Sequence, residues 1–149
     1  MPALRKLHTF IDVAAVLLLL PCTGGYAGAA PETALTSAVD AARGPCPPLQ
    51  WDPLVARAAE MMNHATDDYV NHRTGASPDT DPMPALRTIG YTGSKATLLS
   101  GYGAGEAAAI HGLIVQGYKL IPDCSYTHYG TDILHGAGFV LTSVVLGVS

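Results

Sequence analysis

The feature that most constrains the fold of this chain is its first 29 residues, which have the pattern of a secretory signal and so do not count toward the folded domain. Arg5 and Lys6 give the segment a positive start, and a short apolar stretch follows. That stretch is too short to span a bilayer comfortably, and the small residues around Ala29 are typical of a cleavage site. We therefore expect a signal peptide at 1–29 and one secreted domain at 30–149, with no stable membrane insertion after cleavage. The alternative is a signal that is retained as an anchor.

The cysteines give the second constraint. The chain has 3, and Cys22 leaves with the signal. The exported domain keeps Cys46 and Cys124 in an oxidising compartment, where a disulfide between them is the simplest outcome. Closing such a long loop contributes about 4 kcal/mol in the chain-entropy model. A pair of free thiols is the alternative interpretation.

The charge of the chain excludes one class of partner. The chain has 8 basic and 12 acidic residues, and removing the signal changes its formal charge from −4 to −5. There is no run of Lys or Arg, so nucleic acid is not an expected partner. The later apolar run at 139–146 has the length of a buried strand rather than that of a membrane helix.

Three helices are expected from apolar periodicity and capping residues. The first begins at Pro31 and ends at a Gly-Pro pair. Asp52 is the expected N-cap of the second helix, which runs to about His72. The third covers 106–116, with Gly117 as its C′ residue.

Strand signals are concentrated near the end of the chain. The β-rich runs at 126–134 and 139–146 flank the sequence His-Gly-Ala-Gly and predict a hairpin. Residues 85–89 read as a helical turn, and the glycine-rich 91–105 reads as a loop with one short strand near 96–99. Helices before and between strands predict a layered α/β domain with a two- or three-stranded antiparallel sheet.

One group of residues has the spacing of a metal site. His64, Asp68 and His72 are four residues apart, which on a helix places them along one face. Such a stripe can hold a transition metal such as zinc, with a further ligand from elsewhere; Glu106 is one candidate. The alternative is a solvated helix face on which Asp68 pairs with one of the histidines.

A second group resembles a thiol active site. Asp123, Cys124 and His128 supply an acid, a nucleophile and a base in one short span. A cysteine in a disulfide has no thiolate, so we expect no catalytic residue here, and His128 is kept only as a cavity candidate. The Gly-x-Ser-x-Gly pattern of serine hydrolases is absent. Trp51, the single tryptophan, is expected to anchor its loop onto the core.

Three blocks of the sequence, taken in order, resemble one known family. They are the block from Cys46 to His72, the block SPDTDPMPALRTIGYTG and the block YTHYGTDI. The matching positions include Pro48, Leu49, Trp51, Asp52, Tyr69, His72, Arg87, Gly90, Tyr91 and Gly130. The series resembles the CAP superfamily, also called SCP domains (cysteine-rich secretory proteins, antigen 5 and plant pathogenesis-related proteins), and in particular short secreted bacterial members of the actinobacterial type. The resemblance covers roughly 32–147 and implies an αβα sandwich with three main helices on a small antiparallel sheet.

The departures from this family bear on function. The family cavity usually gathers two histidines and two acids that can bind zinc, and only His72 maps onto one of them. The expected glutamate is missing near Lys95, and the expected second histidine is missing from 115–123. The resemblance therefore argues against an intact set of four ligands.

Two functions from different classes follow. The first is a secreted, non-enzymatic CAP-like protein without a cofactor, which binds a protein, a lipid or a cell-wall component. The second is a zinc-binding protein or hydrolase that uses His72 with His64, Asp68, Glu106 or His128. A carrier of apolar ligands is a third possibility, because some members of the family bind sterols or fatty acids.

Overall fold

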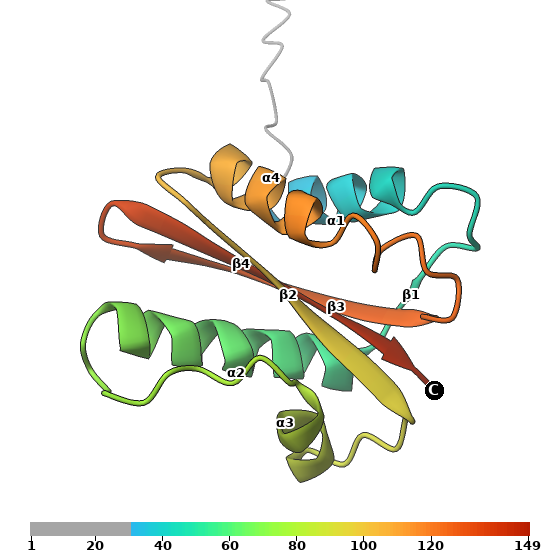
Figure 1. Cartoon of the computed structure of the whole chain (residues 1–149), viewed down its shortest axis with the longest axis horizontal. Coiled ribbons are helices and arrows are strands. Elements are labelled where there is room, and N and C mark those ends of the chain that lie inside the picture. Colours follow the sequence, from blue (N-terminus) through green and yellow to red (C-terminus); the bar gives the residue numbers. More distant parts are fainter. Residues whose placement is uncertain (1–30) are drawn as a thin grey trace, which may run out of the picture.

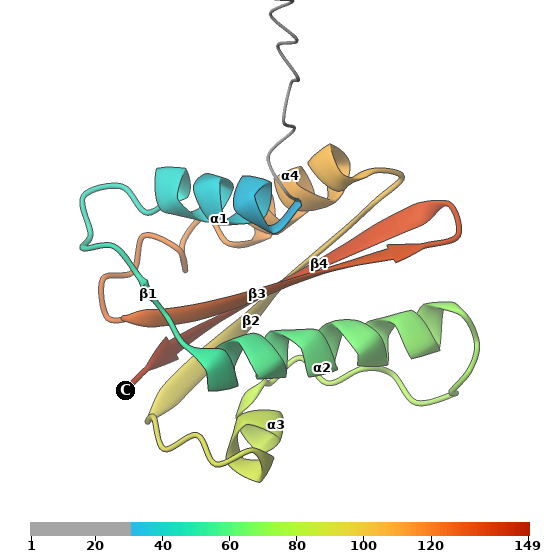
Figure 2. The ribbon, with the colours of Figure 1, turned by 180° about the vertical axis from the view of Figure 1, so that it is seen from behind.

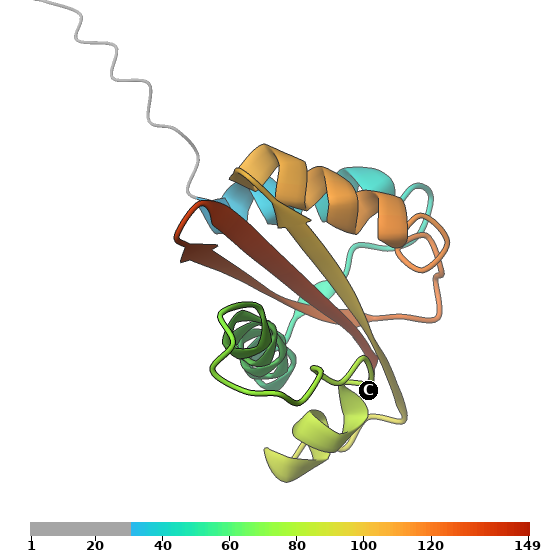
Figure 3. The same cartoon turned by 60° about the vertical axis from the view of Figure 1, so that its left-hand side comes forward.

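The computed structural model describes residues 31–149, which form three layers (Figure 1). Helices α1 (Pro31–Ala42) and α4 (Glu106–Gln116) cover one face of a sheet, and helices α2 (Pro53–Val70) and α3 (Met83–Thr88) cover the other. Figure 3 shows the sheet between the two helical layers from the side. The fold is therefore the αβα sandwich that the sequence predicts, while the expected signal peptide lies outside the described residues.

The sheet has four strands in the order β1-β3-β4-β2. They are β1 (Gln50–Trp51), β2 (Lys95–Gly103), β3 (His128–Gly136) and β4 (Phe139–Val148). Strand β4 pairs antiparallel with both β3 and β2, which confirms the predicted hairpin and antiparallel sheet. The two-residue β1 was not expected, and it pairs in parallel with the start of β3.

Strand β4 is the centre of the core because it is covered on both faces. Its side chains alternate between two apolar clusters, so that Val144 and Leu146 meet the α1 and α4 side while Val145 meets the α2 side. The first cluster also contains Leu35, Val39, Leu49, Leu99, Leu113, Ile121 and Tyr126. The second contains Val55, Ala58, Ala59, Leu86 and Tyr91. This arrangement explains the continuous apolar run of β4, because a strand buried on both sides has no polar face.

Helix α2 begins where the sequence predicts. The Asp52 carboxylate accepts hydrogen bonds from the backbone N–H groups of Leu54 (2.8 Å) and Val55 (3.0 Å). The helix ends at Val70, before the expected His72. Although α2 has 18 residues, no helix within 31–149 combines the length and the apolar character needed to cross a membrane.

Two glycine-containing strands lie unusually close to helices. A β-carbon at Gly101 of β2 would collide with the Ala109 carbonyl group of α4, and one at Gly130 of β3 would collide with the backbone of Ala56 in α2. The expectation that 91–105 is mainly loop was thus wrong, since β2 runs through nine of these residues. The glycines of β2 do not form a turn; they let the strand pack closely against a helix.

Candidate functional site

The two cysteines of the described domain form a disulfide, as predicted. Cys46 and Cys124 are bonded, with their Cα atoms 5.2 Å apart and a sequence separation of 78. Cys124 therefore has no thiolate to offer, and the interpretation of Asp123, Cys124 and His128 as a thiol active site is not supported. The bond instead fixes the segment that leads into β3.

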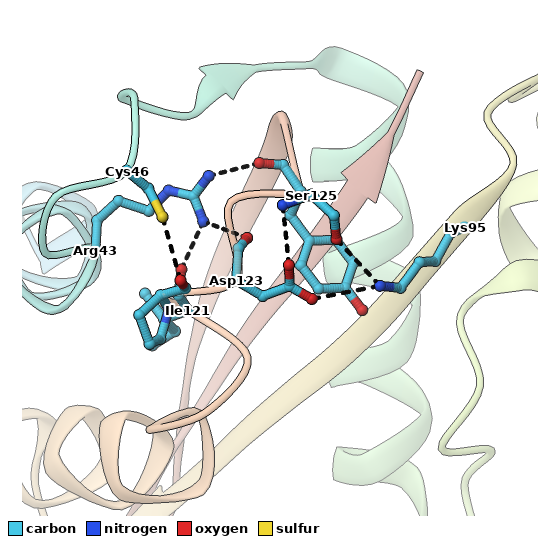
Figure 4. Close-up of polar contacts among 8 residues, drawn as sticks. Arg43, Cys46, Lys95, Ile121, Asp123 and Ser125 are labelled. Atoms are coloured by element: carbon cyan, nitrogen blue, oxygen red, sulfur yellow. Dashed lines mark hydrogen bonds and ion pairs between the residues drawn. The ribbon is translucent and has the colours of Figure 1, made fainter.

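A buried arginine holds the same segment (Figure 4). Arg43 is only 3 % exposed, and its guanidinium donates to the carbonyl oxygens of Ile121 (2.6 Å), Asp123 (2.8 Å) and Tyr126 (2.6 Å). A further bond reaches Pro47 O at 3.2 Å, on the other side of the disulfide. Every one of these acceptors is a neutral backbone carbonyl. The planar guanidinium, with its five N–H donors, therefore holds backbone segments together and does not pair with an acidic side chain. We call residues 121–127 the anchored segment.

Lys95 closes the outer side of the anchored segment. Its ammonium lies 4.2 Å from the ring centroid of Tyr126, 3.2 Å from Ser125 Oγ and 3.5 Å from Asp123 Oδ2 (Figure 4). Burial opposes the charge of Lys95, but contacts with Tyr126 and Asp123 outweigh it and raise the pKa of this ammonium. The pKa of the Asp123 carboxyl is lowered below its ordinary value, mainly by the hydrogen bond from the Ser125 backbone and then by that from the Ser125 side chain. The nearby charge of Lys95 adds a smaller effect in the same direction.

The candidate metal ligands on α2 do not form a continuous stripe. His64 and Asp68 lie on the helix, whereas His72 follows its end in a left-handed conformation with φ 57°. Asp68 accepts a hydrogen bond from Arg73 Nε (2.7 Å), and Arg73 also bonds to Asp67. The predicted pairing of Asp68 with a histidine was therefore wrong, since an arginine just beyond the helix takes that place.

The other two candidate residues lie on different elements. Glu106 begins α4, on the opposite side of the sheet from α2, and its carboxylate is 3.8 Å from His135 Nε2. His128 begins β3, and its Nδ1 is 2.8 Å from Thr127 Oγ1. Within 31–149 no three side chains of His, Cys, Asp or Glu are placed so that they could hold a metal ion.

Trp51 is exposed rather than buried as expected. Leu49, two residues earlier, occupies the core position, while β1 lies at the border of the sheet and leaves 59 % of Trp51 accessible. The sequence alone does not distinguish these two positions, because both side chains are apolar and the border location depends on the pairing of β1 with β3. An exposed tryptophan beside a hollow is a frequent mark of a binding surface.

Two clefts meet at Trp51. The first, which we call the α2 cleft, has a volume of about 440 Å³ and lies between α2 and β3. Its lining comprises Trp51, Pro53, Ala56, Arg57, Glu60, Thr131 and Asp132. The second, the α1 cleft, has about 310 Å³ and is lined by Thr33, Thr36, Ser37, Trp51 and Thr131. Trp51 and Thr131 thus belong to both clefts, which lie on opposite sides of the sheet.

A buried amide positions the carboxylate in the α2 cleft. Asn63 is 3 % exposed, and its Nδ2 donates to Asp132 Oδ2 at 2.7 Å and to Leu141 O at 3.3 Å. Asn63 therefore holds one oxygen of Asp132 while it ties α2 to the hairpin. Sequence reasoning missed Asn63, although a polar residue on the apolar side of a helix, as Asn63 and Asp67 both are, is the signal that could have revealed it.

Comparison with known proteins supports the fold. Neither a protein-family model nor a curated protein sequence matches the chain. Among solved structures, an outer surface protein from Borrelia burgdorferi superposes with a TM-score of 0.63 at 12% identity, covering 79% of this chain and 92% of the other. A cysteine-rich secretory protein from Staphylococcus aureus superposes with a TM-score of 0.59 at 13% identity, and the match covers 78% of this chain but only 38% of that protein. The domain therefore has a CAP-like fold.

Proposed function

We propose that this protein is a non-enzymatic binding protein that acts outside the cell or at its surface, and that Trp51 and its two clefts form the binding surface. The observation that carries the proposal is the exposure of Trp51 at the junction of the α1 and α2 clefts. The indole supplies apolar area, and the polar groups around it can orient a ligand.

The location is supported by independent features. The disulfide between Cys46 and Cys124 suits an oxidising compartment, and the two structural neighbours are described as an outer surface protein and a secretory protein. A CAP-like domain in that setting meets proteins, lipids and wall polymers, which are the ligand classes that we expect from the sequence.

The single tryptophan provides a direct test. Because the chain has 1 Trp, its fluorescence reports on the proposed surface without labelling. The exported protein is titrated with peptidoglycan fragments, with phospholipid vesicles and with a library of linear peptides, and we expect one of these probes to shift the emission. Trp51→Ala should abolish binding as measured by co-sedimentation or calorimetry. Tyr118→Ala, which removes an exposed aromatic ring outside both clefts, should leave it unchanged.

The non-enzymatic part of the proposal has its own test. We expect no turnover of a panel of peptide and ester substrates. Hydrolysis that disappears in His72→Ala would contradict the proposal and favour the hydrolase alternative.

The zinc alternative is supported only by His64 and Asp68, which line one shallow hollow on the surface of α2. Zinc bound at about one ion per chain after purification without chelator, and lost in His64→Ala, would establish it. Elemental analysis of the exported protein decides this directly.

A further inference from the structure

The first step concerns the border of the sheet at β3. Strand β1 pairs only with His128 and Tyr129, and the described part of the chain places no strand beside 131–136. Figure 2 shows this part of β3 running between α1 and α2, with no strand of the described residues along its outer side. We call residues 131–136 the free edge.

The second step identifies the backbone groups that point outward. Tyr129 O accepts a hydrogen bond from Asp52 N (3.0 Å), so the backbone groups of Tyr129 face away from β4. Because direction alternates along a strand, the N–H and C=O groups of Thr131, Ile133 and His135 also face outward. The other border of the sheet is different, since Ser100 N of β2 donates to the Gln116 side chain at 2.6 Å.

The third step concerns what lies on either side of the free edge. A strand added to β3 would direct successive side chains to opposite faces of the sheet. The α2 cleft and the α1 cleft lie on those two faces, and both reach Thr131 at the edge itself. Strand addition requires unpaired backbone N–H and C=O groups at the edge and pockets on both faces for alternate side chains of the added strand. This edge offers both.

Charge indicates which side chain suits the α2 cleft. Its charged residues are Arg57, Glu60 and Asp132, and Arg57 is already paired with Glu60. Asp132 receives only a neutral amide hydrogen bond from Asn63, which leaves a net negative charge in the cleft. The α1 cleft offers only hydroxyl groups besides Trp51. A basic side chain on one face and a small polar one on the other complement this pair.

We propose that the free edge of β3 binds an extended segment of a partner protein, which joins the sheet as a fifth strand and places a Lys or Arg side chain in the α2 cleft beside Asp132. This inference rests on the proposed function and specifies its ligand. The partner donates to and accepts from the backbone of Thr131, Ile133 and His135, and Trp51 covers the end of the added strand.

The test begins with a library of linear 12-residue peptides displayed on phage and selected on the exported protein. We expect selected peptides to contain a basic residue and to slow hydrogen exchange at the amides of Thr131, Ile133 and His135. In the free protein these three amides should exchange much faster than those of Asp132 and Leu134, which face β4. Failure to select any peptide, or protection of other amides, would overturn the proposal.

Variants separate backbone pairing from side-chain contact. Thr131→Pro removes one outward N–H without removing a bond to β4, and should weaken peptide binding at least about tenfold. Thr131→Val keeps the amide but removes a hydroxyl that lines both clefts, so the loss of affinity in Thr131→Pro beyond that in Thr131→Val measures the backbone hydrogen bond. Asp132→Asn should reduce the preference for a basic residue while exchange protection persists; an unchanged preference would refute the basic-residue assignment.

A scan of the peptide leaves the protein untouched and guards against misfolding of Thr131→Pro. N-methylation of one peptide amide at a time should abolish binding at every second position only. A scan without this period would refute strand addition.

Other occupants give different results. A dimer that dissociates in Thr131→Pro would assign the edge to a second copy, and protection of the three amides in the unprocessed chain alone would assign it to residues 1–30. A saccharide or lipid that requires Trp51 but is indifferent to Thr131→Pro would overturn the edge proposal while the proposed function stands.

Discussion

Two neighbouring stretches of the chain are held in opposite ways. The anchored segment at 121–127 is fixed by a disulfide, a buried guanidinium and an ammonium over an aromatic ring. The free edge at 131–136 begins five residues after Tyr126, the last residue bonded to Arg43, and has no partner strand on its outer side among the described elements. The difference indicates that the restraints on β3 are placed before the strand, so that its direction is set while its outer backbone stays accessible.

The largest expected effect comes from removing the disulfide. Cys46→Ser with Cys124→Ser should lower the free energy of unfolding by about 4 kcal/mol, because the two cysteines are 78 positions apart and the unfolded chain regains the entropy of that loop. In the unaltered protein, urea unfolding with and without a reductant measures the same contribution of the disulfide to the free energy of unfolding. A loss below about 1 kcal/mol would mean that the non-covalent contacts alone fix the anchored segment.

The next effect comes from Arg43. Arg43→Ala should cost about 3 kcal/mol, because the carbonyl groups of Ile121, Asp123 and Tyr126 lose their donor in a buried place. Arg43→Lys should cost less, since an ammonium can satisfy only part of this set. Arg57→Ala is the control, because Arg57 is exposed and pairs only with Glu60, and should change stability by less than about 0.5 kcal/mol. Equal losses for Arg43→Ala and Arg57→Ala would contradict the assigned role.

Asn63 gives the corresponding test on the side of the free edge. Asn63→Ala should cost about 2 kcal/mol, because it leaves Asp132 and the Leu141 carbonyl without their shared donor. It should also loosen Asp132 and so weaken the selected peptides, whereas Arg43→Ala measured below its unfolding transition should leave their affinity nearly unchanged. Chemical denaturation and fluorescence titration of both variants check the contrast.

These results show which parts of the molecule a sequence can predict. The helices at Pro31, Asp52 and Glu106 and the hairpin were found because caps, periodicity and turn residues are local signals. Arg43, Asn63 and the exposure of Trp51 were not found, since each depends on segments far apart in sequence that only the fold brings together.

The smallest expected effect is the pH dependence of the anchored segment. The folded pKa of Asp123 lies below the ordinary value of the group, so its stabilisation is complete above that ordinary value and is lost as the pH falls through the folded pKa. Asp123→Asn should therefore flatten the acid limb of the stability curve slightly below the ordinary pKa of an aspartate and change little at neutral pH. Thermal unfolding across that range measures it. An unchanged acid limb would show that Asp123 keeps its ordinary pKa.

The parallel pairing of β1 has a consequence for the length and direction of whatever joins β3. Because β1 ends with Trp51 beside Tyr129, the proposed added strand would stop at Trp51 at one end. At the other end lies the hairpin turn, where Gly138 is exposed. Six residues of β3 span about 20 Å between these limits. If the proposed strand addition takes place, the segment that binds would therefore begin beside Trp51, and the rest of a longer chain could continue past the hairpin.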